Sequence, residues 1–191
     1  GITHSERKPI NIKFPYKLFG IQCWLALPKA SETMKPEFHN YKKEEIPSVI
    51  SNNIIINIIL GSAFEKKSPL KNISNGIFLE IKIRIACKLE LPEDIEELAI
   101  YVLSGKLNYN NKIIQGGEML ILVRAKDFFV EALEDSHFVL LGGDVVNEKR
   151  YLWWNFVSSD MELIENAKQN WLNKKFKMPI NDNKDFIPLP N

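Results

Sequence analysis

The order of hydrophobic and polar residues predicts a chain dominated by short β-strands. Ile77–Ala86 alternates most regularly, with apolar residues on one face and charged residues on the other, as in a half-buried antiparallel strand. Ile54–Leu60 is a continuous apolar run interrupted only by Asn57, which indicates a buried strand. The other predicted strands are Phe19–Leu27, Leu98–Leu103, Lys106–Tyr109, Lys112–Ile114, Met119–Val123, Phe128–Ala132 and His137–Leu141. Strands of this length between Gly, Asn and Pro turns favour an all-β sandwich or barrel.

The segments between these strands predict a hairpin and a long loop. Ser104 and Gly105 stand between Leu98–Leu103 and Lys106–Tyr109, and this tight-turn pair predicts a β-hairpin. Pro28–Pro47 is polar with scattered aromatic residues, which is typical of a long loop.

One helix is predicted near the C-terminus. Ser159 and Glu162 have the spacing of a capping box, and apolar residues follow at helical intervals. Lys174 and Lys175 are expected at the far end of this helix, where the helix dipole favours cations. The last 14 residues, MPINDNKDFIPLPN, are expected to be extended and, because of apolar residues such as Phe186, to dock on the rest of the chain.

Composition describes an ordinary globular protein. The chain has 191 residues, of which 45% are hydrophobic and 26% charged, with a net charge of +1. This balance argues against direct nucleic-acid binding, and no apolar run is long enough for a membrane span. Cys23 and Cys87 are too few for a disulfide framework and are expected to be buried thiols, which fits a reducing, cytoplasmic location.

The candidate chemistry lies at the N-terminus, in the sequence GITHSER. His4 and Glu6 are two residues apart, so in extended backbone their side chains would point the same way. An imidazole and a carboxylate suit iron, manganese, copper, nickel or zinc. A mononuclear site needs about three or four protein ligands, and His39 and His137 lie far along the chain. We therefore expect half of a metal site, completed by residues upstream of Gly1; an exposed pair near a terminus is the alternative interpretation.

Several sequence blocks along the whole chain point to one family. They are GITHSER, GIQCWLALP, YKKEEIP, YVLSGKL, SHFVLLGGDVVNE, WWNFVSSDMELIENAKQNW and DFIPLP. In this order they resemble the C-terminal half of the pirin family, which belongs to the cupin superfamily. The GIQ-x-W-x-x-LP and WWNFVSS blocks are the most specific.

The resemblance implies a fold and a domain organisation. A full-length pirin has two jelly-roll domains, and this chain would carry the second, with most of the N-terminal cupin absent. The expected fold is all-β, a cupin-type jelly-roll sandwich or barrel with one C-terminal α-helix and an extended tail. Expected boundaries are residues 1–20 for the remnant of the first cupin and the interdomain linker, 21–157 for the second cupin, and 158–191 for the helix and docking tail.

The resemblance also implies a metal site in the first cupin. In pirins a His-x-His pair and a later His-x-Glu pair hold one metal. His4 and Glu6 match the later pair, whereas the His-x-His pair has no counterpart in this chain. The implied cofactor is one divalent transition metal, iron foremost, with copper, nickel, manganese or zinc as alternatives. With half a site, the chain alone is expected to bind metal incompletely or not at all.

A second metal site is not expected in the second cupin. Counted from its two glycine turns, the positions of the cupin ligands fall near Pro92, Asp94, Leu98 and Leu120. Only Asp94 has a ligand side chain, and the acidic run around it is expected to be a solvated loop. His39 is predicted at the surface, and His137 is predicted to make a structural hydrogen bond at the start of its strand.

Two functions are compatible with the resemblance. The first is a quercetin 2,3-dioxygenase-like oxidoreductase that acts on a flavonol-like molecule once the N-terminal cupin, or a second copy of the chain, completes the metal site. The second is a non-catalytic module, either a pirin-type transcription cofactor that binds a protein partner or a dimerising cupin.

Overall fold

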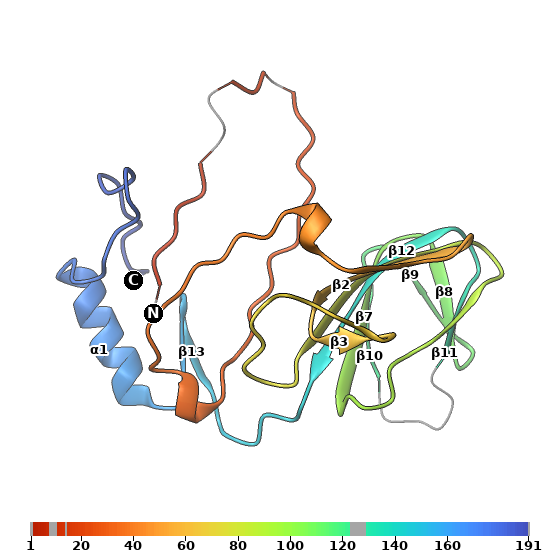
Figure 1. Ribbon diagram of the computed structural model, residues 1–191. Helices are drawn as coiled ribbons and strands as arrows, with labels where there is room; N and C mark the ends of the chain where they lie inside the picture. The colour runs from red at the N-terminus through yellow and green to blue at the C-terminus, as the bar shows by residue number, and fades with distance from the viewer. Residues whose placement is uncertain (1, 8–10, 14, 123–128, 191) are drawn as a thin grey trace. The chain divides into compact units, whose positions relative to one another are not determined.

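The computed structural model describes residues 2–7, 11–13, 15–122 and 129–190, which group into two compact units (Figure 1). Unit 1 comprises Gly1–Phe38 and Asn147–Asn191, and unit 2 comprises His39–Val146. Unit 2 contains a β-sandwich, and unit 1 contains the helix and both ends of the chain. Residues 21–38 and 147–157, which sequence analysis places within the second cupin, group with the helix in this division.

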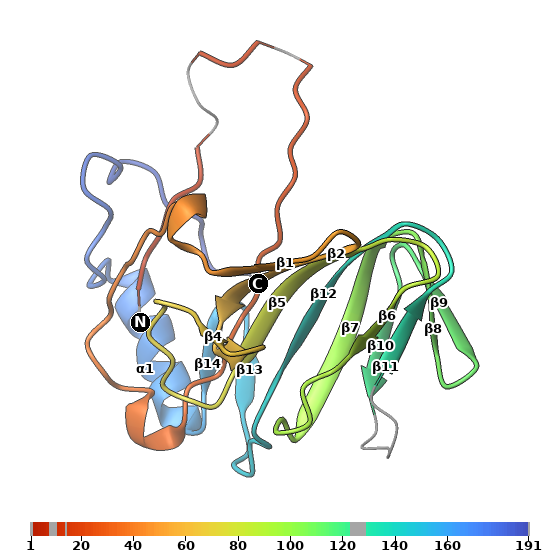
Figure 2. The ribbon, with the colours of Figure 1, turned by 45° about the vertical axis from the view of Figure 1, so that its right-hand side comes forward.

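Unit 2 contains two sheets and a small separate hairpin. Among the described residues the larger sheet has six strands in the order β1-β2-β5-β12-β7-β10, and each strand is antiparallel to its neighbours (Figure 2). The smaller sheet has the order β6-β11-β8-β9. The strands of the larger sheet are β1 Ser48–Ile50, β2 Ile54–Leu60, β5 Ile77–Ile83, β12 Ser136–Gly143, β7 Glu97–Ser104 and β10 Met119–Leu122. The others are β6 Lys88–Glu90, β11 Phe129–Ala132, β8 Lys106–Tyr109 and β9 Lys112–Gln115, with β3 Ser62–Ala63 and β4 Lys66–Lys67 in the separate hairpin. This is the all-β sandwich that the sequence predicts.

The core of unit 2 consists of apolar side chains on the facing surfaces of the sheets. Along β5, residues alternate between buried and less buried, because successive side chains of a strand point to opposite faces. Phe138, in β12, is fully buried. Other fully buried members of the core are Ile58, Leu79, Ile81, Ile100, Val102, Leu107, Val130 and Leu140. The alternation expected for Ile77–Ala86 is thus confirmed over Ile77–Ile83.

The hairpin predicted across Ser104 and Gly105 is wrong. β7 pairs with β12 and β10 in the larger sheet, whereas β8 pairs with β11 and β9 in the smaller one. Gly105 is the point at which the chain leaves one sheet for the other. Its φ is +88°, and a Cβ there would collide with Ser136. A glycine therefore marks a turn here, but the turn crosses between sheets instead of folding a strand back on itself.

The strand predicted over Phe19–Leu27 is also wrong. These residues have no regular secondary structure, and large side chains such as Phe19, Trp24 and Leu25 are exposed. A run of β-forming residues becomes a strand only where a sheet edge accepts it, since β-propensity depends on packing context. Cys23 lies in this segment and is exposed instead of buried, while Cys87 is half-buried.

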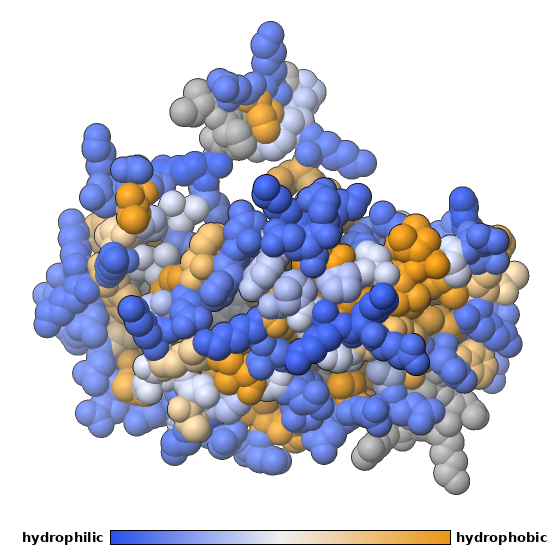
Figure 3. Space-filling model, in the orientation of Figure 1, coloured by the Kyte–Doolittle hydropathy of each residue, from blue (hydrophilic) through white to orange (hydrophobic). Residues whose placement is uncertain are grey.

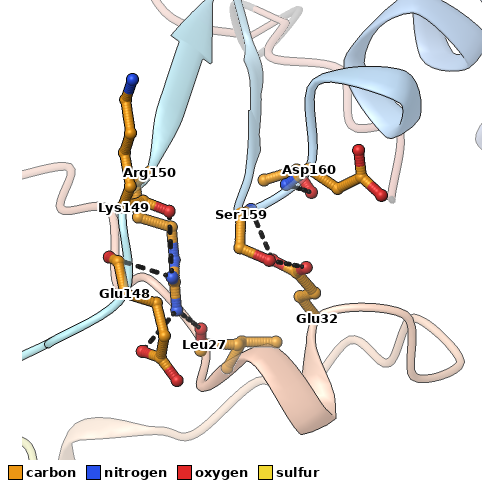
Figure 4. A network of polar contacts seen from close by, with 8 residues as sticks. Leu27, Glu32, Glu148, Lys149, Arg150, Ser159 and Asp160 are labelled. Carbon is orange, nitrogen blue, oxygen red and sulfur yellow. Dashed lines mark hydrogen bonds and ion pairs between the residues drawn. The ribbon is translucent and has the colours of Figure 1, made fainter.

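In unit 1, helix α1 spans Met161–Leu172, close to the prediction but with a different cap. The N-cap is Asp160, whose side chain accepts the N–H of Glu162 at 2.8 Å. Ser159 instead binds Glu32: its N–H and its Oγ donate to the two carboxylate oxygens at 2.9 and 2.5 Å (Figure 4). These hydrogen bonds hold the pKa of Glu32 below its ordinary value and attach the Lys29–Ser31 turn to the start of the helix.

The far end of α1 also differs from the prediction. The helix ends at Leu172, so Lys174 and Lys175 lie beyond its last turn. Lys174 has a φ of +53°, the left-handed backbone that follows many helix ends. In the described part of the chain no helix has the length and apolar character needed to cross a bilayer.

Aromatic rings join the helix to the strands of unit 1 and to the tail. The strands β13 Tyr151–Trp153 and β14 Phe156–Ser158 form a hairpin against α1. The ring centroid of Trp171, on the helix, lies 5.4 Å from the ring centroid of Trp154 and 6.1 Å from that of Phe186 in the tail. Its indole N–H also donates to the carbonyl of Ile187 at 2.8 Å. These contacts hold the tail against the helix.

A polar ladder crosses four strands of the larger sheet. Ser48 Oγ lies 2.6 Å from Asn57 Oδ1, and Asn57 Nδ2 donates to Glu80 at 2.9 Å. The other oxygen of Glu80 lies 2.8 Å from His137 Nε2. Burial alone would raise the pKa of Glu80, but the hydrogen bonds from Asn57 and His137 outweigh it and lower that pKa. The hydrogen bond expected for His137 is therefore present.

We expect Glu80→Gln to reduce the pH dependence of stability in the acidic range. Because the pKa of Glu80 is lower in the folded state, its carboxylate stabilises the fold above the unfolded pKa of ~4.3. That contribution, about 1 kcal/mol, is lost as the pH falls through the folded-state pKa. Denaturant unfolding at several pH values should show the variant less stable at pH 7, with the difference shrinking toward pH 3. Glu90→Gln, at an exposed position on β6, is the control, and an equal effect there would contradict the assignment.

Candidate functional site

The N-terminal segment that contains His4 and Glu6 is bound to the C-terminal tail by neighbouring side chains. Thr3 donates from Oγ1 to the carbonyl of Lys177. Arg7 donates to both oxygens of Asp182, at 2.7 and 2.6 Å, and at 3.1 Å to Asp185. The N-terminal segment is therefore attached to the C-terminal tail within unit 1, through contacts between residues about 175 positions apart.

Ser5 and Arg7 also act on the charge of Asp182. The hydrogen bond from Arg7, followed by one from Ser5, lowers the pKa of Asp182 to about 2. The carboxylate is thus ionised over the whole physiological pH range, and the attachment does not depend on small changes of pH.

His4 and Glu6 lie between the residues that attach the segment. Side chains of fully extended backbone alternate in direction, so in such a backbone His4 and Glu6 would point away from the tail that Thr3, Ser5 and Arg7 contact. Both side chains are exposed, and so are those of Ser5 and Arg7. An imidazole and a carboxylate two residues apart are thus carried on a restrained segment, and this donor pair fits part of a divalent transition-metal site. Within the described ranges no group of three or more His, Cys, Asp or Glu side chains is placed to hold a metal ion.

We expect Asp182→Asn to release the segment around His4 without unfolding the protein. The substitution removes the charge that Arg7 binds with two hydrogen bonds, while exposed ion pairs contribute little to global stability. The NMR order parameters of residues 2–7 should fall, with an unchanged melting temperature. Asp185→Asn removes only the 3.1 Å contact and serves as the matched control. Unchanged order parameters in Asp182→Asn would contradict the proposed attachment.

The positions considered for a second metal site differ in burial and in side-chain type. Leu98 and Leu120 are buried in the apolar core, and Asp94 is exposed in the loop before β7. In the same loop, Glu96 accepts the N–H of Val145 at 2.9 Å. The sandwich interior is apolar apart from a few groups such as the Tyr109 hydroxyl, whose burial raises the pKa of that phenol.

Sequence reasoning proposed His4 and Glu6 as ligands, which stays a prediction, but it missed the residues that attach their segment to the tail. Thr3, Ser5 and Arg7 carry no recognisable signal, since their partners lie in the tail at the other end of the sequence. A period of two in polar residues, Thr3-x-Ser5-x-Arg7, is the only local hint. His39 is exposed, as expected, with its ring 6.3 Å from that of Tyr41.

Unit 2 is a two-sheet β-sandwich, and comparison with known proteins assigns it to the cupins. The sequence model of the Pirin C-terminal cupin domain matches residues 78–177. A Pirin-like protein of Caulobacter vibrioides is 32% identical over 191 residues, which is 100% of this chain and 66% of that protein. Human Pirin is 25% identical over 187 residues, which is 92% of this chain and 61% of human Pirin. The chain belongs to the pirin family. It spans less than two thirds of the length of both relatives.

Solved structures share the fold. Two crystal structures titled quercetin 2,3-dioxygenase from Acinetobacter baumannii superpose with TM-scores of 0.77 and 0.74. The first is 21% identical, and the match covers 88% of this chain and 57% of the dioxygenase chain. The second is 22% identical, and the match covers 78% of this chain and 54% of the dioxygenase chain. At these identities the likeness establishes the fold alone.

Proposed function

We propose that the protein is a mononuclear metal cupin of the pirin type, in which His4 and Glu6 are two of the metal ligands and a preceding cupin domain supplies the others. The observation that carries this proposal is the exposure of His4 and Glu6 on a segment whose neighbouring residues Thr3 and Arg7 are bound to the tail. Membership of the pirin family supports it, as does the coverage of about two thirds of the relatives' length, which leaves room for a further domain in the whole protein.

The role of the chain's own residues in such a site is positional. Arg7 and Thr3 restrain the backbone, so that the imidazole of His4 and the carboxylate of Glu6 are ordered before a metal arrives, and less conformational entropy is lost on binding. A redox-active metal held there would supply the chemistry for oxidising an aromatic substrate. Iron is the proposed metal, and the proposed reaction is a quercetin 2,3-dioxygenase-like ring opening of a flavonol.

The proposal is tested by metal content and activity of this chain beside a longer protein that includes the preceding cupin. We expect close to one iron per molecule in the longer protein, measured by mass spectrometry after purification without chelator. We expect a deficit in the chain alone, and flavonol oxidation only by the longer protein. Flavonol ring opening at an ordinary enzymatic rate by the chain alone, or a longer protein without metal, would contradict the proposal.

A second function, a non-catalytic interaction module, is favoured by exposed apolar side chains. Leu18 and Phe19 are 85% and 66% exposed, and on the larger sheet Ile50 and Ile121 are each 73% exposed. Figure 3 shows hydrophobic residues at the surface at several places between hydrophilic ones. Exposed apolar groups of this kind are found at protein interfaces. The proposed partners are another protein or a second copy of the chain, and a clean monomer in light scattering at high concentration would argue against this function.

A further inference from the structure

A small aromatic hollow lies in unit 1 between the end of helix α1 and the tail. It is lined by the aromatic residues Trp171, Phe176 and Phe186, by Met178, and by polar residues that include Lys174. Its volume is about 50 Å³. About 10–15 Å³ suffices for one water molecule, so the hollow admits a group of a few heavy atoms. This is far below the ~300–1,000 Å³ of small-molecule sites and fits a single apolar side chain.

The three rings that line the hollow are fixed by further contacts. The planes of Phe176 and Phe186 are inclined at 60° and 59° to that of Trp171, so the rings meet at an angle instead of stacking. The indole N–H of Trp171 donates to the carbonyl of Ile187 at 2.8 Å. Phe176 is stacked on Phe156, with an angle of 8° between the ring planes. The hollow is thus formed before a ligand arrives, which lowers the conformational cost of binding.

The surroundings of the hollow carry positive charge. Residues 171–187 contain four lysines and two aspartates, and both aspartates accept hydrogen bonds from Arg7. Lys174 follows the end of the helix in left-handed backbone, and its Nζ lies 4.8 Å from the ring centroid of Phe186. The face of a ring attracts an ammonium group but does not neutralise its charge. Lys174 and Phe186 both line the hollow, so this positive charge is held beside it.

We infer that the hollow binds one apolar side chain of a partner protein, presented within an acidic segment. Phe186 is 41% exposed, so a partner can reach the hollow from solvent. A side chain that fills a preformed pocket is the usual anchor of a protein interface. Carboxylates beside that anchor match the positive charge at Lys174.

A cationic ligand is disfavoured, although aromatic rings attract cations. The ammonium group of Lys174 already lies over the ring of Phe186, and it repels a second cation. The inference rests on the second proposed function, because it describes the protein partner of that function. It does not involve His4 or Glu6.

The inference is tested by titrating the whole chain with three short peptides and following the titrations by NMR. The probe is the peptide Asp-Glu-Leu-Glu-Asp with an acetylated N-terminus and an amidated C-terminus. A second peptide has alanine in place of leucine, and a third has lysine in place of each acidic residue. We expect the leucine peptide to shift the indole N–H signal of Trp171 and the amides of residues 171–187. It should bind at least fivefold more tightly than either of the other peptides.

Two pairs of variants separate the charge from the apolar contact. Lys174→Gln should raise the Kd of the leucine peptide at least fivefold. Its matched control is Lys175→Gln, which removes the same charge from the adjacent residue outside the lining and should change the Kd by less than twofold. Phe186→Ala should also raise the Kd at least fivefold, whereas Ile180→Ala, at an exposed apolar residue of the same tail, should have little effect. Both lysines are exposed, so melting temperatures of their variants should stay within about 2 °C of the parent.

Four results would overturn the inference. Equal binding of the leucine and alanine peptides would show that no apolar side chain enters the hollow. Binding of the lysine peptide as tightly as the leucine peptide would remove the role of the positive charge. Equal weakening by Lys174→Gln and Lys175→Gln would mean that general positive charge attracts the peptide. A chain that self-associates in light scattering but binds none of the peptides would overturn this inference and leave the second proposed function in place.

Discussion

His4→Ala or Glu6→Ala is expected to abolish stoichiometric metal binding in the protein that includes the preceding cupin. Either substitution removes one donor from a site of about four protein ligands. Loss even of an outer-shell partner costs about 10–100-fold in metal affinity, so loss of a direct ligand should cost more than 100-fold. The measurement is metal per molecule by mass spectrometry, together with an affinity from chelator competition, and neither depends on an enzymatic assay.

Ser5→Ala is the matched control for these two variants. It lies between the proposed ligands but is directed toward Asp182 of the tail, so it should retain close to full metal content. A metal content that falls equally in all three variants would indicate a disturbed segment. Full metal content in His4→Ala would show that the site uses other residues.

Trp171→Ala is expected to destabilise unit 1 by about 3 kcal/mol. The indole contacts the rings of Trp154, Phe176 and Phe186, with centroid distances of 5.4, 5.8 and 6.1 Å, and each such pair contributes about 0.5–1.5 kcal/mol beyond burial. The variant also leaves the carbonyl of Ile187 without its indole donor. All four tryptophans of the chain, Trp24 among them, belong to unit 1, so denaturant unfolding followed by tryptophan fluorescence reports on this unit.

Two further variants separate the contributions of Trp171. Trp171→Phe keeps an aromatic ring but loses the hydrogen bond, and should cost about 1 kcal/mol plus the smaller ring area. Trp24→Ala, at a side chain that is 57% exposed, should change stability by less than about 0.5 kcal/mol. If Trp171→Ala were no more destabilising than Trp24→Ala, the aromatic contacts would not be what holds the tail.

The family and the candidate ligands could be predicted from the sequence because both are recognised from local patterns. Ile54–Leu60 and Lys106–Tyr109 are strands with the predicted bounds. Val123 and Phe128, at the ends of two predicted strands, lie outside the described residues, but Met119–Leu122 and Phe129–Ala132 are strands. Short strands such as Lys88–Glu90 were missed, because three residues are too few to display a period of two.

The errors share a physical cause, which is competition from distant residues. Ser159 has the spacing of a helix cap, but Glu32, 127 residues away, binds it, and Asp160 caps the helix instead. Phe19–Leu27 has the composition of a strand, but in the described structure it joins no sheet. Neither outcome is encoded in the local sequence, since a hydrogen-bonding group takes whichever partner the folded chain brings within reach.

The pattern of apolar and polar residues predicted the sandwich class, because alternation assigns each strand one buried face, and the spacing of His4 and Glu6 marked them as a candidate ligand pair. Tertiary structure decided which strands are neighbours, with Gly105 carrying the chain from one sheet to the other. It also decided that the tail restrains the segment around the candidate ligands through Arg7 and Asp182. A contact such as that between Arg7 and Asp182 closes a loop of more than 100 residues. A local sequence pattern does not specify which distant residues will meet, because that depends on the packing of the whole chain.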